Sequence, residues 1–299
     1  MTRRQVMRAT IEAGSVQAAS DVVAELGEGP CWDGATLLWV DIPAGRLHRT
    51  GHPSGQTATA RLGAPVSAVL PTAGGGVLVA RRDRLALVEA GGTERTVASV
   101  PAPPGVRFND GAVDPQGRVW IGSMDTREQS PLGVLYRLDA GGVLTPVITG
   151  VTISNGLGWS PDGSRLYYID SPTCRVDVLD FDAAFGEVSG RRPFADLSGE
   201  PGVPDGLTVD ADGGVWVARY AGGALHRYTP DGGLDTVVSL PVTYPTSCAF
   251  GGPDLADLYV TTASAPLSAA GRAGQPLAGR LFRLRPGPKG LPQPAAVIS

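Results

Sequence analysis

The feature that most constrains the fold is a pattern that recurs six times along the chain. In each copy, a turn rich in glycine, aspartate or proline precedes a short strand centred on a large residue. The aligned large residues lie 39 to 49 positions apart and are Trp39, Leu78, Trp120, Tyr167, Trp216 and Tyr259. A period of this size, with no helical pattern between copies, is that of a four-stranded propeller blade. The sequence therefore predicts an all-β, six-bladed β-propeller of four-stranded antiparallel blades around a central channel.

The blades account for the chain from about residue 16 to residue 299, as a single propeller domain, and residues 1–15 are expected to be a flexible N-terminal tail. An open ring would leave unpaired strand edges. We therefore expect the N-terminal segment 16–26 and the C-terminal segment 292–299 to share a blade and close the ring. A two-sheet sandwich is the alternative fold, but it explains six equal repeats less well.

Composition limits the partners. The 42 glycines and 26 prolines are spread along the chain, which favours many turns over a linker. The net charge is −4 and no basic stripe is present, so nucleic acid is not expected as a partner. No window approaches the roughly 18 apolar residues of a membrane span, and no signal peptide is recognisable. We expect a cytoplasmic protein without membrane contact, as a monomer or weak homodimer, that acts on a small molecule.

A polar residue lies eleven or twelve positions before each aligned large residue, across the turn and in the preceding strand. These residues are Glu28, Ser67, Asn109, Asn155, Asp205 and Ser247. In a propeller the first strand of each blade lines the central channel. All six side chains should therefore converge at one mouth of that channel.

The chemistry of this set predicts a cation. Buried carboxylates need partners, and like charges repel unless a cation lies between them. Carboxylate and amide oxygens suit Ca²⁺, Mg²⁺ or Mn²⁺, and zinc also accepts carboxylate oxygen. The histidines His48, His52 and His226 lie in later strands or turns and do not join the set. Simple turn chemistry is the alternative for the two asparagines, but six aligned positions favour a site.

Arg107 lies two residues before Asn109, so on a strand both side chains face the same side. A guanidinium repels a metal ion, so its place beside one makes sense if an anionic or hydroxyl-rich ligand is held between them. A salt bridge at the rim is the alternative.

Six motifs carry a family resemblance. They are LGEGPCWD (26–33), APVSAV (64–69), RFNDGAVDPQGRVWIGSMD (107–125), ISNGLGWSPDGSRLYYIDS (153–171), VPDGLTVDADGGVWVA (203–218) and TSCAFGGPDLADLYVTTA (246–263). In this order they resemble the motifs of the regucalcin/gluconolactonase (senescence marker protein) family, from about residue 22 to residue 285. The resemblance implies a six-bladed propeller that hydrolyses sugar lactones, such as gluconolactone or xylonolactone, with one divalent cation (Ca²⁺, Zn²⁺, Mn²⁺, Mg²⁺ or Fe²⁺).

The resemblance also implies residue roles. Glu28, Asn155 and Asp205 fall on the family's metal-binding positions, and Asp205 doubles as the general acid/base. Arg107 and Asn109 fall on positions that contact the substrate.

One position departs from the family pattern. Arg127 stands where many members carry a glutamate that contributes to sugar binding. Asp125 is expected to contact the substrate in its place, with Glu128 as the alternative. The loop from Asp125 to Gly133 is expected to lie over the channel mouth and to shape specificity.

The predicted reaction is hydrolysis of a sugar lactone to the aldonic acid. The metal would polarise the carbonyl, Asp205 would act as general base and then acid, and Arg107 and Asn109 would orient the sugar. Because no histidine joins the ring, a Ser-His-Asp acyl-enzyme is disfavoured. Two alternatives remain: a calcium-binding regulatory propeller without turnover, and a propeller esterase or phosphotriesterase, whose mouth would be more apolar.

Overall fold

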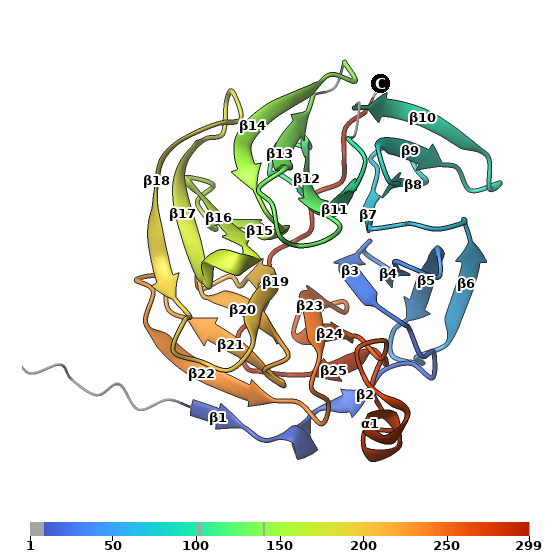
Figure 1. The fold of residues 1–299 in the computed structure, drawn as a ribbon, viewed down its shortest axis with the longest axis vertical. Coiled ribbons are helices and arrows are strands. Elements are labelled where there is room, and N and C mark those ends of the chain that lie inside the picture. Colours follow the sequence, from blue (N-terminus) through green and yellow to red (C-terminus); the bar gives the residue numbers. More distant parts are fainter. Residues whose placement is uncertain (1–8, 101–102, 140, 299) are drawn as a thin grey trace, which may run out of the picture.

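The computed structural model describes residues 9–100, 103–139 and 141–298. Their strands form six sheets arranged as blades around a central axis (Figure 1). Within each blade the four successive strands pair antiparallel, and the first strand of each contacts the first strands of the neighbouring blades. The predicted six-bladed β-propeller is confirmed.

The first three blades follow the chain in order. They comprise β3 (Gly27–Trp32), β4 (Thr36–Asp41), β5 (Arg46–Gly51) and β6 (Thr57–Arg61); β7 (Ala68–Pro71), β8 (Val77–Ala80), β9 (Arg84–Val88) and β10 (Glu94–Ser99); β11 (Val106–Val113), β12 (Val119–Asp125), β13 (Gly133–Leu138) and β14 (Leu144–Val151).

The last three blades continue the pattern. They comprise β15 (Ser154–Trp159), β16 (Arg165–Asp170), β17 (Arg175–Asp182) and β18 (Glu187–Asp196); β19 (Val203–Val209), β20 (Val215–Tyr220), β21 (Ala224–Tyr228) and β22 (Leu234–Ser239); β23 (Pro245–Gly251), β24 (Asp257–Thr262), β25 (Phe282–Leu284) and β2 (Gln17–Ala18). The short elements outside this pattern are β1 (Ala9–Ile11), η1 (Ala13–Ser15), η2 (Ser171–Thr173) and α1 (Ala269–Gly274).

The aligned large residues form the packing between blades. Each lies on the second strand of its blade and is at most 2% exposed. Trp120 of the third blade packs edge-to-face on Trp159 of the fourth, with ring centroids 5.9 Å apart. Trp216 of the fifth blade contacts Phe250 of the sixth in the same way. Each such aromatic side chain removes about 150–250 Å² of surface from water. The aligned residues of the repeat are therefore a large part of the hydrophobic core.

Two buried aspartates brace the turns that lead into β12 and β20. Asp114 Oδ2 accepts hydrogen bonds from Trp120 Nε1 (3.1 Å) and Arg118 Nε (2.6 Å). Asp210 Oδ2 accepts from Trp216 Nε1 (2.8 Å) and Arg227 Nε (2.7 Å). In both aspartates, Oδ1 accepts two backbone N–H groups of the turn. The charge of each is therefore fully supplied with donors.

The N-terminal segment closes the ring as expected, because β2 pairs antiparallel with β25 at the outer edge of the sixth blade. β1 pairs parallel with β22 of the fifth blade. The range predicted to be a flexible tail thus holds a strand at Ala9–Ile11, whose backbone groups satisfy the open edge of β22. Residues 1–8 lie outside the described residues.

The C-terminal segment does not share a blade, and that expectation was wrong. It crosses one end of the channel instead, with isolated bridges from Gly290 to Asp210 and from Ala296 to Thr72. Prolines at 292 and 294 cannot donate to a strand ladder. A segment so rich in proline is better suited to strap the ring than to extend a sheet.

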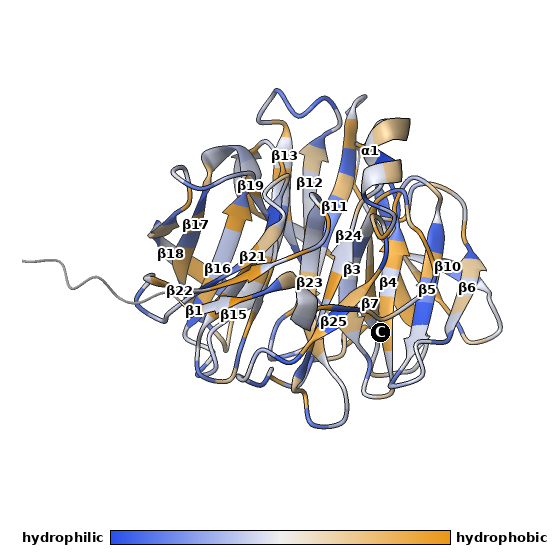
Figure 2. Ribbon diagram, turned by 90° about the horizontal axis from the view of Figure 1, so that it is seen from below, coloured by the Kyte–Doolittle hydropathy of each residue, from blue (hydrophilic) through white to orange (hydrophobic). Residues whose placement is uncertain are grey.

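Apolar and polar residues are interspersed along the strands, and polar residues occupy many of the loops (Figure 2). Alternation of this kind buries the faces where blades pack and leaves turns in water. None of the helices among the described residues is long and apolar enough to cross a membrane.

Candidate functional site

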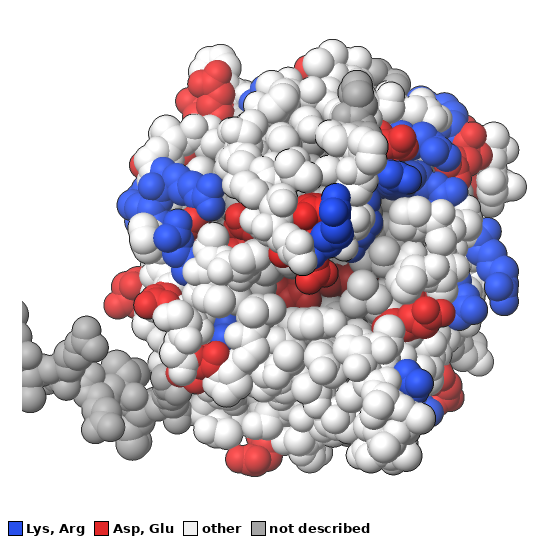
Figure 3. Space-filling view, viewed as in Figure 1, with Lys and Arg blue, Asp and Glu red and all other residues white. Residues whose placement is uncertain are grey.

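The six aligned polar residues lie along the inner strands, as the register predicts. Glu28, Asn109, Asn155 and Asp205 lie within β3, β11, β15 and β19 and are 6 to 8% exposed. Ser247 is on β23, and Ser67 immediately precedes β7. Figure 3 shows a hollow at the centre of the ring with acidic atoms inside it and basic atoms beside it.

A break in strand register explains how turn-like residues sit in a strand. The pairing of β11 with β12 shifts between Phe108 and Gly111, and that of β15 with β16 shifts between Ser154 and Leu157. β19 of the fifth blade carries a shift at the matching place, between Pro204 and Leu207. In the first and sixth blades Glu28 and Ser247 keep their pairing partners, and the shift lies beside them. Bulges leave residues unpaired and re-aim their side chains. Bulges rather than regular strand alternation therefore direct Asn109, Asn155 and Asp205.

The glycines that follow two of these residues allow the blades to approach closely. A Cβ on Gly206 would lie 2.1 Å from Ser247 Oγ of the next blade. A Cβ on Gly156 would lie 2.5 Å from the backbone nitrogen of Leu207. A side chain at either position would push neighbouring inner strands apart, so the Asn-Gly and Asp-Gly pairs serve packing as well as turning.

A chain of hydrogen bonds links four polar side chains. Arg107 Nη1 donates to Asn109 Oδ1 at 2.7 Å. Asn109 Nδ2 donates to Asn155 Oδ1 at 2.9 Å and to the carbonyl oxygen of Ser154 at 2.9 Å. Asn155 Nδ2 in turn donates to Ser171 Oγ at 2.8 Å. The third and fourth blades are thus joined through their site residues.

Three carboxylates in this region act on one another's charge and have few hydrogen-bond donors. Glu28 Oε2 accepts from the backbone N–H of Gly29 (2.9 Å), and Asp110 Oδ1 accepts from that of Gly111 (2.7 Å). For Asp205, no side-chain hydrogen bond is found within the part of the chain that the structure describes. Buried carboxylates in such surroundings are costly when ionised.

Their pKa values reflect this environment. Burial, and then the charge of Asp110, raise the pKa of Glu28 from its ordinary 4.5 to about 8. Burial raises the pKa of Asp110 to about 6. Burial, followed by the charges of Glu28 and Asp110, raises the pKa of Asp205 well above its usual range, while Arg107 opposes the rise. Clustered, under-supplied carboxylates of this kind suit a bound cation.

The donor set fits a hard divalent cation. The described residues hold no group of three or more His, Cys, Asp and Glu side chains arranged as a metal site. A cation would therefore need the amide oxygen of Asn155 beside carboxylates such as Glu28 and Asp205. Asn155 Oδ1 accepts one hydrogen bond and keeps a second lone pair. Oxygen-only ligation of this type is what Ca²⁺, Mg²⁺ and Mn²⁺ prefer.

The loop between β12 and β13 is held by Asp125. This side chain is 2% exposed, and its carboxylate accepts backbone N–H groups of Arg127 (3.1 Å), Gln129 (3.2 Å) and Ser130 (3.0 Å). Glu128, at the middle of the loop, is exposed and has a left-handed backbone (φ 59°). Its charge acts on both Arg107 and Asp205. The loop thus brings Glu128 toward the site, while the oxygens of Asp125 are occupied.

Comparison with known proteins identifies the family. The model of the SMP-30/gluconolactonase/LRE-like region matches residues 26–264. The chain belongs to this family. The regucalcin of Sus scrofa is 41% identical over 279 residues, which cover 89% of this chain and 93% of that protein. The pentonolactonase of Haloferax volcanii is 38% identical over 282 residues, covering 91% of this chain and 95% of that protein.

A solved structure agrees with these relatives. The calcium-binding protein regucalcin from Agrobacterium tumefaciens is 31% identical and superposes with a TM-score of 0.92, covering 97% of this chain and 99% of that one. The family resemblance inferred from the six motifs is confirmed.

Several residues near the site were missed in the sequence. Asp110 is not one of the six aligned residues, yet its charge acts on both Glu28 and Asp205. Tyr220, at the end of β20, packs on Tyr244 with ring centroids 5.1 Å apart, and burial together with the charge of Asp205 raises its pKa to about 12. Tyr220 follows the aligned Trp216 by four residues, so extending the repeat register along each second strand would have found it.

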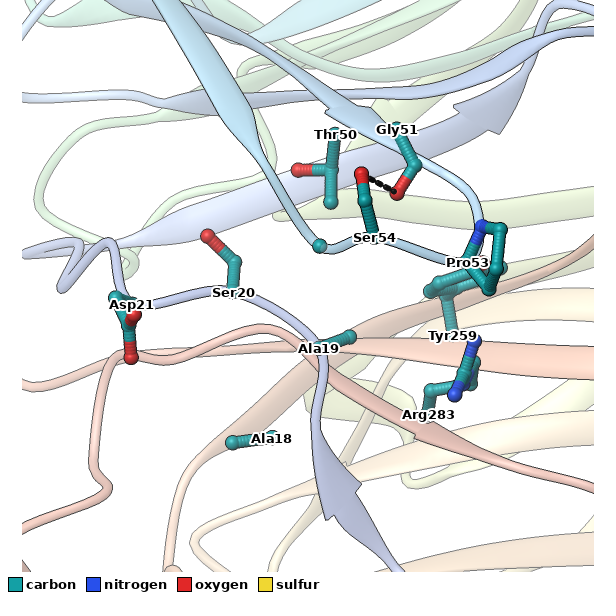
Figure 4. Close-up of a pocket in the computed structure, with 11 residues that line it drawn as sticks. Ala18, Ala19, Ser20, Asp21, Thr50, Gly51, Pro53, Ser54, Tyr259 and Arg283 are labelled. Carbon is teal, nitrogen blue, oxygen red and sulfur yellow. Dashed lines mark hydrogen bonds between the residues drawn. The ribbon is translucent and has the colours of Figure 1, made fainter.

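The other cavities are of different character. The channel contains a cavity of about 490 Å³. Asp110 and Ser247 are among its lining residues, and the C-terminal strap Leu291–Pro294 crosses it. A smaller pocket of about 160 Å³ lies at the seam of the first and sixth blades, lined by Ser20, Thr50 and Arg283 among others (Figure 4). The seam pocket includes none of the six aligned residues.

The histidines are part of the packing. His48 stacks on Trp39 with centroids 4.2 Å apart and hydrogen-bonds Thr59. His52 hydrogen-bonds Tyr259. Both histidines thus lie in a later strand or turn of the first blade, outside the aligned set.

Proposed function

We propose that this protein is a metal-dependent lactonase that hydrolyses a gluconolactone- or xylonolactone-like sugar lactone to the aldonic acid. The observation that carries the proposal is that Glu28, Asp110 and Asp205, which have few hydrogen-bond donors, act on one another's charge. Arg107, which donates to Asn109, acts on Glu28 and Asp205 as well. Membership of a family that includes a pentonolactonase supports it.

Glu28, Asn155 and Asp205 would hold one divalent cation, with Ca²⁺, Zn²⁺, Mn²⁺, Mg²⁺ and Fe²⁺ as the candidates. A divalent cation, when bound, polarises an ester carbonyl and stabilises the negative charge that develops on its oxygen. The channel mouth supplies the concave, largely buried setting in which such charge stabilisation is effective.

Arg107 and Asn109 would orient the sugar. Both N–H groups of the Asn109 amide are already used, on Ser154 and Asn155. Asn109 can therefore only accept a hydrogen bond, from a sugar hydroxyl. Arg107 Nη1 is engaged with Phe108 and Asn109, which leaves its other N–H groups to donate to ring or hydroxyl oxygens. The pair thus offers one acceptor and several donors in a fixed arrangement, which lowers the entropic cost of reaching the transition state.

Asp205 would transfer the proton. Its carboxylate has a raised pKa, caused first by burial and then by the neighbouring carboxylates. In its ionised form this carboxylate can accept a proton from the attacking water. The water oxygen forms the new bond to the lactone carbon, the bond from that carbon to the ring oxygen breaks, and Asp205 delivers the proton to the departing oxygen.

The acidic contact to the sugar is assigned to Glu128, the alternative of the two loop residues. Asp125 spends its oxygens on three backbone N–H groups. Direct contact of Asp125 with the substrate stays a prediction. The role proposed for Asp125 is to hold the loop so that Glu128 lies over the channel mouth.

A metal-exchange experiment tests the function. Chelated protein is reloaded with Ca²⁺, Zn²⁺, Mn²⁺, Mg²⁺ or Fe²⁺ and assayed on gluconolactone, xylonolactone, an aryl ester and a phosphotriester. We expect hydrolysis of at least one sugar lactone that is lost on chelation and restored by a divalent cation. Metal binding without turnover of any substrate would contradict the lactonase and favour a calcium-binding regulatory role. Preference for the aryl ester or phosphotriester would favour the other hydrolase class.

A further inference from the structure

The side chain of Asn155 is held from both sides. Its Oδ1 accepts a hydrogen bond from Asn109 Nδ2, and its Nδ2 donates to Ser171 Oγ at 2.8 Å. Asn155 is 6% exposed and Ser171 is 4% exposed. Both bonds are therefore shielded from water, and each lost bond would leave a buried polar group unpaired.

The direction of the Asn155 amide follows from the donors around it. Asn109 points its Nδ2 group at Asn155, because its own Oδ1 is engaged by Arg107. If the Asn155 amide were reversed, two N–H groups would face each other. Oxygen toward Asn109 and nitrogen toward Ser171 is the arrangement in which every neighbour is satisfied.

Backbone hydrogen bonds hold Ser171 in place on both sides. It opens η2 (Ser171–Thr173), and its backbone N–H donates to the carbonyl of Ile153, which directly precedes β15. Its carbonyl accepts from the backbone N–H of Cys174. The preceding residue, Asp170, accepts the backbone N–H groups of Thr152 and Ile153 with its carboxylate. The hydroxyl is thus tied to the beginning of the strand that carries Asn155.

We propose that Ser171 is a positioning residue for metal binding: it fixes the Asn155 amide so that Oδ1 is presented to the cation. This inference rests on the metal site of the proposed function. Groups that hold a metal ligand from behind typically change metal affinity by about 10- to 100-fold when removed. Loss of the hydroxyl should act on affinity for the cation and leave the reacting groups unchanged, because Ser171 hydrogen-bonds the amide nitrogen and no other site residue.

The test compares Ser171→Ala with two other variants. Ser171→Thr keeps a hydroxyl at the same position. Ser160→Ala is the matched control, because Ser160 is a buried serine (8% exposed) that follows β15 at its other end and bonds Asp162. Dissociation constants for Mn²⁺ and Ca²⁺ are measured by titration calorimetry on chelated protein, together with thermal unfolding.

For Ser171→Ala we expect Kd to rise by about tenfold or more, with kcat at saturating Mn²⁺ close to that of the wild type. Ser171→Thr should recover most of the affinity, and Ser160→Ala should bind metal as the wild type does. The inference is overturned if Ser171→Ala binds Mn²⁺ and Ca²⁺ within twofold of the wild type, or if Ser160→Ala weakens binding equally. A wild-type protein that binds neither ion in the calorimeter would overturn the metal site itself, which separates the two failures.

Discussion

Two kinds of carboxylate lie along the inner strand segments, one kind near each end. At the site end, Asp110 accepts one backbone N–H, and Asp205 accepts no hydrogen bond from the residues that the structure describes. Four and five residues further along the same segments, Asp114 and Asp210 each accept a tryptophan N–H, an arginine N–H and two backbone N–H groups. Asp114, Asp205 and Asp210 are buried and Asp110 is half-buried, so residue type alone does not separate the two kinds.

The difference lies in the supply of donors. A fully supplied carboxylate stabilises the turn around it and has no capacity left for a ligand. A carboxylate short of donors destabilises the isolated protein and keeps its lone pairs for a cation or a proton. The end with Asp114 and Asp210 therefore supports the fold, and the end with Asp110 and Asp205 is the one to which we assign the proposed chemistry.

The sharpest test of this contrast pairs Asp205→Asn with Asp210→Asn. Asp205→Asn should lower kcat/KM on the sugar lactone by about 10²- to 10⁴-fold, as expected for loss of a general base. Without metal, this variant should unfold at no lower temperature than the wild type, because one of three clustered charges is gone. Asp210→Asn should instead lose about 1–3 kcal/mol of stability, because Trp216 and Arg227 lose the charge of their shared buried acceptor and Arg227 keeps only its ion pair with Asp235.

Lactone kinetics and urea unfolding measure both effects on both variants. The comparison fails if Asp205→Asn keeps near-normal activity, or if Asp210→Asn is as stable as the wild type. Activity per folded molecule of Asp210→Asn is the internal control and should change little.

The sequence could predict the repeat, and with it the blades and the register of the ring. The repeat was visible because Trp120 and Trp216 must fill equivalent spaces between blades. Asp110 was hidden because an Asn-Asp-Gly run is read as a turn, and the bulge that directs it appears only when β11 pairs with β12. The course of the C-terminal strap depends on bridges to Thr72 and Asp210, far away in sequence. Local pattern cannot specify such contacts.

The second prediction concerns pH. The folded protein raises the pKa of Glu28 from 4.5 to about 8, and Asp205 shifts in the same direction. The folded state therefore binds these protons more tightly than the unfolded chain does. The free energy of unfolding gains its full contribution from this binding below about pH 4.5, and the contribution is lost as the pH rises to about 8. Chelated protein should lose at least about 1 kcal/mol of stability between pH 5 and pH 8.

Thermal and urea unfolding across that range, with chelator and with saturating Mn²⁺, measure this effect. Metal should remove the decline, since a bound cation compensates the ionised carboxylates. Glu28→Gln should flatten the profile of the chelated protein. An unchanged slope in that variant would show that other groups cause the decline.

The smallest expected effects concern the loop between β12 and β13, where the residues that the structure describes supply donors to Asp125 and none to Glu128. Glu128→Gln should raise KM by about tenfold, the worth of one hydrogen bond to a charged group, with stability unchanged.

Asp125→Asn should act on the loop itself, because an amide cannot accept all three backbone N–H groups as well as the carboxylate does. Trypsin reports the difference, since Arg127 is exposed within this loop. Cleavage there should accelerate in Asp125→Asn and stay slow in Glu128→Gln. If instead Asp125→Asn raises KM while its loop resists trypsin as the wild type does, Asp125 is the sugar contact and Glu128 is not.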